Sequence, residues 1–287
     1  MLRQLIAGVL FAGWMAGSVS AQSTINSVNR FAYGANIGWL DCRADGVNGT
    51  VLGEYICSGY IYAANVGWIN LGGGTAVNGI RYQNNSASDF GVNHDGLGNL
   101  RGYAWGANIG WVNFENQGAP RLDLCTGKLS GSVYGANVGW ISLSNSVAFV
   151  QTDSLRRGVD TDGDGIPDAF ELTWTGSLTN MNSTSDLDGD GVSDRNEYLA
   201  GTDPTNPADR LAVLSYFVGT DALKWASKPS RHYHIEERLS LNPSSPWVDS
   251  SLGLITHDPG ATTTRSGFSA PSSQHFFRIE VVRPLVP

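Results

Sequence analysis

Residues 32–42 read AYGANIGWLDC, and similar phrases recur as YAANVGWINL at 62–71, AWGANIGWVNF at 104–114 and YGANVGWISL at 134–143. Each phrase places a strand-forming segment before a short turn and then begins a second strand with Gly-Trp. After each Trp the apolar residues alternate along the chain, which is the period of a β-strand. Because a single hairpin cannot bury its apolar face alone, the phrases predict an array of β-hairpins packed against one another. We interpret the repeated Asn as turn residues, because Asn tolerates left-handed backbone; they are Asn36, Asn65, Asn108 and Asn137.

The repeated Trp residues admit two interpretations; they are Trp39, Trp68, Trp111 and Trp140. They are either a stacked core layer, since Trp buries a large area and repeats need identical contacts between neighbours, or an exposed row of rings that stack on sugars. We favour the core interpretation, because a repeated aromatic ring in small β units is more rarely found on the surface than in the core. The phrase resembles the Gly-x-Ala-Trp-x-x-Asn-x-Gly-Trp-Ile repeats of exported bacterial proteins, which implies extracellular display but no particular chemistry.

Two of the three cysteines occupy positions that are apolar in the other repeats. Cys42 occupies a position where the other repeats carry Leu71, Phe114 and Leu143, and Cys57 one where later repeats carry Leu100 and Leu129. Both thus replace predicted inward apolar residues of the first repeat. In an oxidising compartment this favours a disulfide between Cys42 and Cys57. Cys125 is then left over, and we expect it to be a buried small apolar residue.

Two acidic loops, 160–171 and 186–197, match the twelve-residue calcium loop at every ligand position. Such a loop supplies carboxylates at positions 1, 3 and 5, a glycine at 6, a backbone carbonyl at 7, a further carboxylate at 9 and a bidentate Glu at 12. Calcium takes six to eight hard oxygen ligands, which short carboxylates wrapped around a glycine provide. The predicted ligands of two calcium ions are Asp160, Asp162, Asp164, Ile166, Asp168 and Glu171 in the first loop, and Asp186, Asp188, Asp190, Val192, Asp194 and Glu197 in the second.

Each loop leads into a short predicted helix, 168–175 and 194–200. Ser193 is a suitable N-cap for the second helix, and Gly201 a suitable terminator. Apolar entering helices are absent from the sequence before either loop, unlike in sensor EF-hands. The segment resembles thrombospondin type 3 repeats and related bacterial Asp-x-Asp-x-Asp-Gly repeats, including the trailing phrase EYLAGTDP at 197–204. This resemblance implies a rigid connector filled with metal.

The first 21 residues have the plan of a signal peptide, because a basic residue and a short apolar run precede Val-Ser-Ala. No segment has the roughly 20 consecutive apolar residues of a membrane helix, so we expect a secreted or cell-surface protein. The net charge of -8 argues against nucleic acid as a partner, since no basic stripe offsets it. Ten of the 26 acidic residues lie in the two loops, so much of the charge is ligand charge.

The C-terminal part returns to strands, predicted at 211–218, 222–226, 232–238, 246–249 and 275–282. These indicate a small β-sandwich, with Trp225, Tyr233 and Phe277 as core residues. His232 and His234 alternate on one strand, an arrangement that needs no function but is also compatible with a metal site. The sequence contains no G-x-S-x-G, H-E-x-x-H, phosphate loop or Cys-x-x-Cys motif.

The sequence thus predicts a mainly β protein in four parts: a signal peptide at 1–21, a β-hairpin repeat array at 22–150, paired calcium loops with short helices at 153–210, and a β-sandwich at 211–287. We expect a calcium-binding structural or adhesive protein without catalytic activity. The alternative is an extracellular carbohydrate-binding module that uses the repeated Trp residues. Cell-surface or matrix glycans, and self-association through free strand edges, are the expected partners besides calcium.

Overall fold

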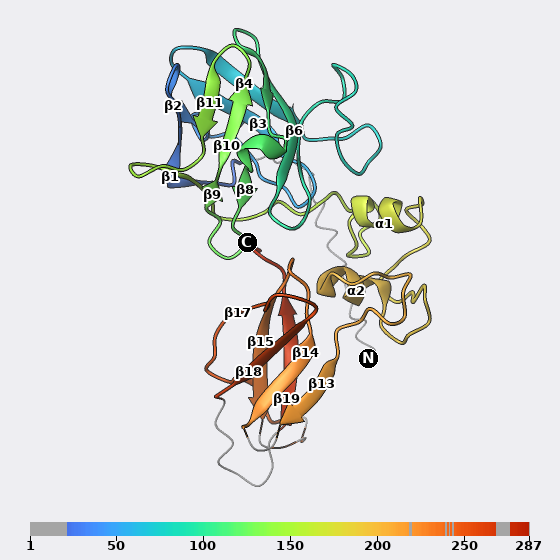
Figure 1. The fold of residues 1–287 in the computed structure, drawn as a ribbon. Coiled ribbons are helices and arrows are strands. Elements are labelled where there is room, and N and C mark those ends of the chain that lie inside the picture. Colours follow the sequence, from blue (N-terminus) through green and yellow to red (C-terminus); the bar gives the residue numbers. More distant parts are fainter. Residues whose placement is uncertain are drawn as a thin grey trace, which may run out of the picture.

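The computed structural model describes residues 22–217, 220–238, 240, 242, 244–267 and 276–286. The predicted signal peptide, 1–21, lies outside these residues. Figure 1 shows a β-barrel at one end, two sheets at the other, and the helices α1 and α2 beside the junction. The protein is mainly β, as predicted. Among the described residues, no helix has the length and apolar character needed to cross a membrane.

The four phrases form four hairpins that close into a barrel. Its strands are β1 (Ile25–Gly34), β2 (Gly38–Asp41), β3 (Ser58–Ala63), β4 (Gly67–Gly73), β6 (Leu100–Gly106), β7 (Gly110–Asn113), β10 (Ser132–Gly135) and β11 (Gly139–Ser142). Each strand pairs antiparallel with its neighbours, and β1 closes the ring on β11 with Tyr33 opposite Ser142 and Gly34 opposite Ile141. Closure was not predicted. It pairs both edges of the repeat array, so the free edges that we expected for self-association are absent from these eight strands.

Shorter elements extend the barrel wall. β5 (Val92–His94) pairs with β6, and β12 (Val150–Thr152) pairs with the beginning of β1. β8 (Arg121–Leu122) and β9 (Leu129–Ser130) form a separate hairpin after the 3-10 turn η1 (Asn116–Gly118).

The four turns are linked in a ring by their asparagines. Each Asn side chain donates its Nδ2 hydrogen to a backbone carbonyl of the preceding repeat at 3.1 Å, and the first repeat completes the circle by bonding to the fourth. The pairs are Asn36 with Val138, Asn65 with Ile37, Asn108 with Val66 and Asn137 with Ile109. The left-handed residue of each turn is the glycine before Trp, with φ between 75° and 81°. The predicted turns are confirmed, but Asn serves to bond the neighbouring hairpin.

The repeated Trp residues lie on the outside of the barrel, so the core interpretation was wrong. Their exposed fractions are 46, 45, 45 and 48%. The residue after each Trp fills the barrel instead: Leu40, Ile69, Val112 and Ile141 are buried in one continuous core. Since side chains alternate across a strand, an inward residue at that position forces Trp outward.

The cysteines do not form the predicted bridge. The structure records Cys42 and Cys57 as free thiols, both buried in the barrel core. Burial raises the pKa of each to about 12, so both thiols act as small neutral core groups. Cys125, which we expected to be buried, is exposed in the turn between β8 and β9.

The C-terminal part is two facing sheets, as predicted. One contains β13 (Val213–Phe217), β14 (Ala222–Ala226) and β18 (Thr262–Ser266); the other contains β15 (His232–Arg238), β16 (Val248–Asp249), β17 (Ile255–Thr256) and β19 (Phe276–Val282). Trp225 packs edge-on against Tyr233 at 5.7 Å between ring centroids, and Phe277 lies partly buried against the same cluster. Sequence reasoning missed the polar strand β18 and the short β17.

Candidate calcium sites

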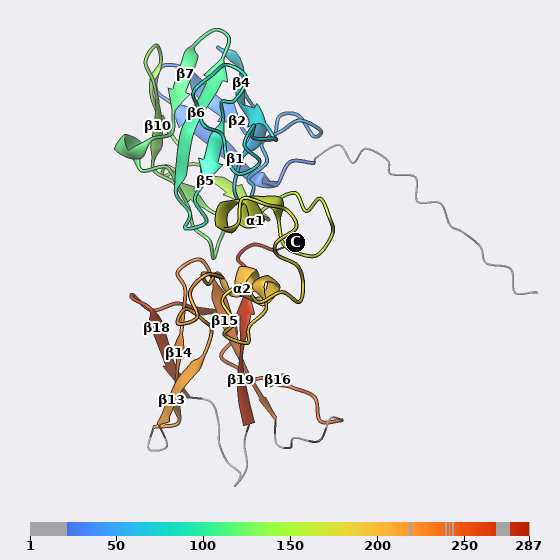
Figure 2. The ribbon, with the colours of Figure 1, turned by 90° about the vertical axis from the view of Figure 1, so that its right-hand side faces the viewer.

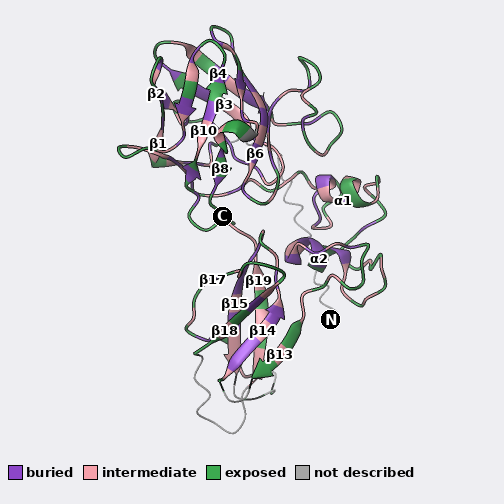
Figure 3. Cartoon of the chain, in the orientation of Figure 1, coloured by how far each residue is buried: buried purple, intermediate pink, exposed green. Residues whose placement is uncertain are grey.

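Both acidic loops lie at the junction between the barrel and the C-terminal sheets, and each loop leads into a short helix (Figure 2). The helices are α1 (Asp168–Trp174) and α2 (Asp194–Ala200). The Ser193 side chain accepts a hydrogen bond from Asn196 N, and Gly201 ends α2 in the left-handed conformation. These are the predicted cap and terminator. The end of the second loop is therefore fixed by local sequence, and α2 is largely buried (Figure 3).

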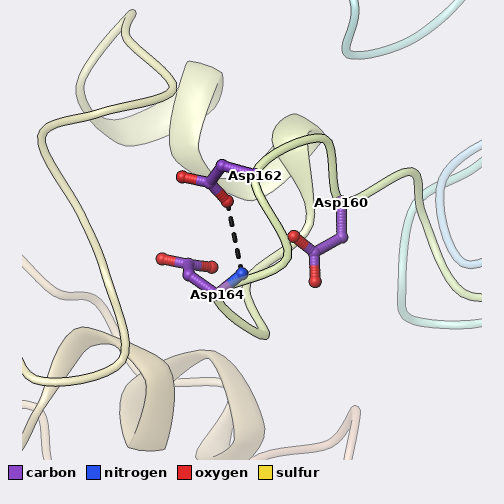
Figure 4. A group of neighbouring side chains, drawn as sticks. All are labelled: Asp160, Asp162 and Asp164. Carbon is purple, nitrogen blue, oxygen red and sulfur yellow. Dashed lines mark hydrogen bonds between the residues drawn. The ribbon is translucent and has the colours of Figure 1, made fainter. Parts of the chain in front are cut away.

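In the first loop the three alternating aspartates converge. Asp160, Asp162 and Asp164 each present a carboxylate oxygen, and these atoms lie within 4.8 Å of one another (Figure 4). Asp160 accepts hydrogen bonds from the backbone N–H groups of Gly163 and Gly165 at 2.8 and 3.1 Å. Gly165 has φ of 98°, which an L side chain rarely adopts. The glycines thus let the loop curl around its first carboxylate.

The second loop repeats this geometry. Asp186, Asp188 and Asp190 again bring carboxylate oxygens within 4.8 Å of one another. Asp186 accepts from Gly189 N at 2.8 Å and from Gly191 N at 2.9 Å, as Asp160 does in the first loop. Two independent segments therefore fold into the same acidic loop, which is what their common ligand pattern predicts.

The closing glutamates are buried beside these aspartates without hydrogen-bond partners. Both carboxylate oxygens of Glu171, and Oε2 of Glu197, are inaccessible and unpaired among the described residues. Burial, followed by the nearby Asp carboxylates, raises the pKa of Glu171 to about 7; for Glu197 the same causes raise it to about 7 against the opposing hydrogen bond from Thr202. Buried unpaired carboxylates are costly unless a cation compensates them. One oxygen each of Asp164, Asp188 and Asp190 is also buried without a hydrogen bond, and that of Asp190 lies 3.9 Å from the Arg210 guanidinium group.

The position-9 aspartates are held in a different way. Asp168 accepts from the backbone N–H and the hydroxyl of Thr161 at 2.7 and 2.6 Å. Asp194 accepts from Leu187 N and from the Ser185 hydroxyl. Both carboxylates therefore tie the start of the loop to the start of the helix. The residues at position 7 are held by their backbone N–H groups. The N–H of Ile166 donates to the Asp164 carboxylate, and the N–H of Val192 donates to the Asp190 carboxylate.

The donor set fits calcium. It consists of carboxylate oxygens, several of them buried without a proton donor, around a glycine-containing turn; hard oxygen donors in a flexible loop are what Ca²⁺ prefers. In each loop the aspartates at positions 1, 3 and 5 and the glutamate at 12 would hold the ion. A bound ion would neutralise carboxylates that otherwise repel one another.

The bacterial TSP3 repeat matches residues 160–177 and 186–207. The two matched segments contain both acidic loops and both helices. Comparison with curated proteins and with solved structures found no significant match. Together with the aspartate clusters, the TSP3 match indicates a calcium-binding structural segment in this chain.

The two histidines are placed apart from any ligand cluster. His232 Nε2 lies 3.1 Å from the carbonyl oxygen of Leu124, and His234 Nδ1 lies 2.9 Å from Asp249 Oδ2. Within the described residues, the groups of three or more potential metal-ligating side chains are the two Asp triplets of the TSP3-like loops.

Sequence reasoning missed the residue that attaches the second TSP3-like loop to the rest of the protein. Tyr198 directly follows Glu197 and packs with Ile166 and Met181 in the small core of the segment. Its hydroxyl bonds to Glu54 of the barrel, and Arg283 after β19 donates to the same hydroxyl. The Tyr198 backbone carbonyl accepts from Arg231, the residue before β15. No sequence motif indicates such a contact, because the residues that Tyr198 contacts are far away in sequence.

Proposed function

We propose that this chain is an exported structural protein in which two calcium ions order the segment that joins the barrel to the C-terminal sheets. The observation that carries the proposal is the set of buried, unpaired carboxylate oxygens in both TSP3-like loops. Export is proposed from the signal-peptide plan of residues 1–21. Extracellular calcium, at about millimolar concentration, suits loops of this type.

The contacts of α2 explain why calcium would act on the whole molecule. The segment has a small core of its own, formed by Ile166, Met181 and Tyr198. Such a core supplies little ordering free energy, so bound metal would provide much of it. Because α2 contacts both the barrel and the C-terminal sheets, ordering the loops would fix the angle between them.

Calorimetric titration of the chelated protein with calcium tests this function. We expect two ions per chain and a higher melting temperature in calcium than in chelator. Glu171→Gln and Glu197→Gln should each remove one ion while the other loop keeps its own. Asp45→Asn, which changes a carboxylate in a barrel turn, is the matched control and should still bind two ions. Identical melting curves in calcium and chelator would contradict the proposal.

A second candidate function, glycan binding through the barrel surface, gains support from the exposure of the repeated Trp residues. Each of them pairs with an aromatic ring directly across its hairpin, at 4.7–5.0 Å between centroids. The pairs are Tyr33 with Trp39, Tyr62 with Trp68, Trp105 with Trp111, and Tyr134 with Trp140. We call these eight residues the aromatic belt. Exposed rings held rigidly by a neighbour offer flat apolar surface at low entropic cost, which favours stacking on sugar rings.

Pull-down on insoluble polysaccharides tests the aromatic belt. We expect binding that is lost when Trp68 and Trp111 are both changed to Ala. The matched control is Trp174→Ala, which removes an exposed Trp of α1 outside the belt. Binding that survives the double belt change, or is lost equally in the control, would rule out the belt as the glycan site.

A further inference from the structure

A cavity of about 570 Å³ lies between the barrel, the chain that leaves β12 and the C-terminal part. The barrel contributes Glu54, Tyr55 and the 94–97 turn; the chain leaving β12 contributes 154–157; the C-terminal part contributes Arg231 and residues around Arg283. A volume of this size accommodates a small organic ligand. The cavity is separate from the TSP3-like loops and from the aromatic belt.

The lining of this cavity is positively charged, although the protein as a whole is acidic. It contains the five arginines Arg81, Arg156, Arg157, Arg231 and Arg283, against the two carboxylates of Glu54 and Asp95. Both carboxylates already have partners. Glu54 accepts from Tyr198, and Asp95 accepts from the side chain of Asn99 and from the backbone N–H groups of Leu97 and Asn99. Glu54 also forms an ion pair with Arg283, at 3.7 Å between Oε2 and Nη1. Five arginines against two carboxylates still leave the lining with a net positive charge.

Three of the arginines are held in position by neutral acceptors. Arg231 is buried and donates to the carbonyl oxygens of Tyr198 and Leu199 at 2.6 and 2.7 Å. Arg157 donates to the carbonyl oxygen of Gly165, and Arg283 donates to the Tyr198 hydroxyl. Carbonyl oxygens fix Arg157 and Arg231 without cancelling their charge, whereas the charge of Arg283 is partly offset by its ion pair with Glu54. The lining is thus pre-organised as well as positive.

The remaining two guanidinium groups have no such acceptor. In the described part of the chain, neither Arg81 nor Arg156 has a side-chain hydrogen bond or ion pair. Arg156 is half-buried, and burial lowers its pKa from the usual value. A desolvated guanidinium without an acceptor is costly, and a bidentate oxyanion is the partner that matches its geometry.

We propose that this cavity binds a small organic oxyanion, with Arg156 as its direct partner and Arg81 at the rim. The apolar side chains of Leu97, Leu155 and Val286 also line the cavity. They suit a ligand with a carbon body better than a bare inorganic ion. The class of ligand is therefore a carboxylate, sulfate or phosphate carried on a small organic molecule, such as an acidic sugar.

Isothermal titration of the full chain in saturating calcium tests this site, with sodium galacturonate and sodium sulfate as probes and neutral galactose as the comparison. All titrations are made at one ionic strength. We expect galacturonate to bind, and Arg156→Gln to weaken it by about tenfold or more, because a hydrogen bond between charged groups is lost. Arg81→Gln, at an exposed position, should weaken it less and keeps the test valid if the first variant does not fold. Arg101→Gln on β6 removes a positive charge outside the cavity and should leave binding unchanged.

If sulfate binds with the same dependence on Arg156, the cavity recognises the oxyanion itself. If only galacturonate binds, the cavity recognises the carboxylate together with its carbon body. Either result supports the site. The proposal is overturned if galactose binds as well as galacturonate, if Arg101→Gln weakens binding as much as Arg156→Gln, or if no probe binds at about 10 mM. Because calcium is saturating throughout, failure here leaves the proposed calcium function untouched.

Discussion

The hydroxyl of Tyr198 lies 2.9 Å from Oε2 and 3.1 Å from Oε1 of Glu54, and this contact joins α2 to the barrel. The two residues are 144 positions apart in sequence. Burial raises the pKa of Tyr198 to about 12. The hydroxyl therefore stays protonated and donates a hydrogen bond to the Glu54 carboxylate. The guanidinium groups of Arg157 and Arg283 lie 5.5 and 5.4 Å from the centroid of the Tyr198 ring. One side chain thus connects the second TSP3-like loop to the barrel and to the end of the C-terminal part.

We predict that Tyr198→Phe weakens this junction while keeping the packed ring. Loss of this part-buried hydrogen bond to a carboxylate should lower the free energy of unfolding by about 1.5–3 kcal/mol. Urea unfolding in saturating calcium measures the change. Tyr216→Phe is the matched control, because the Tyr216 hydroxyl also donates to a carboxylate, that of Asp221, but at an exposed site. Equal effects of the two changes would contradict a special role for Tyr198.

The ring of Asn side chains makes a second prediction, about barrel closure. Asn36→Ala removes the bond to Val138 across the seam between the first and last hairpins, whereas Asn65→Ala removes the same bond between adjacent hairpins. Each change should cost about 0.5–1.5 kcal/mol. We expect faster amide hydrogen exchange in β1 and β11 only for Asn36→Ala, because those strands meet across the seam. Indistinguishable exchange patterns would show that the seam is no weaker than the other junctions.

The local features of this fold were predictable from sequence because neighbouring residues determine them. The hairpin turns, the caps of α2 and the acidic loops each depend on residues within a few positions. The outward orientation of the repeated Trp side chains could also have been predicted from the sequence. In each repeat the residues one and three places after Trp are apolar, as Leu40 and Cys42 are, while the residue between them is polar, as Asp41 is. Trp shares its face with that polar residue. The prediction failed because the size of the Trp side chain was given more weight than the strand period.

The long-range features were not predictable in the same way. Barrel closure depends on the pairing of Tyr33 with Ser142, more than 100 residues away, and the repeat phrase is the same in an open array and in a closed ring. The junction around Tyr198 likewise requires the final placement of Glu54 and Arg283. Such contacts are set by packing of the assembled units, and a single sequence carries no periodic signal for them.

The exposure of the aromatic belt gives a third prediction, for fluorescence quenching. Iodide quenches exposed indoles and does not reach Trp225, which is fully buried between the C-terminal sheets. Trp68→Phe should therefore lower the quenchable fraction of the emission, and Trp225→Phe should raise it. Quenching is compared in calcium at constant ionic strength, with circular dichroism to confirm that both variants fold. A quenchable fraction that falls in both variants would be inconsistent with the burial of Trp225.

A fourth prediction concerns acid stability and depends on His94. This ring is buried inside the barrel end, where Nε2 accepts a hydrogen bond from Gly98 N at 3.1 Å and Nδ1 lies 3.2 Å from the carbonyl oxygen of Gly53. Accepting at Nε2 requires a neutral ring, and burial lowers the pKa of His94 below 6.5. The stabilisation that the neutral ring provides is therefore complete above pH 6.5 and is lost as the pH falls through the lowered folded-state pKa.

His94→Gln tests this, because Gln can bond but does not titrate. In wild type the free energy of unfolding should fall below pH 6.5 with a contribution from this group of up to about 1.4 kcal/mol per pH unit. In His94→Gln that contribution should vanish, so the two stability curves converge as the pH is lowered. His257→Gln, which removes an imidazole outside the barrel, is the control for the loss of a histidine. Curves for His94→Gln and wild type that stay parallel from pH 7 to pH 5 would show that this ring does not govern acid stability.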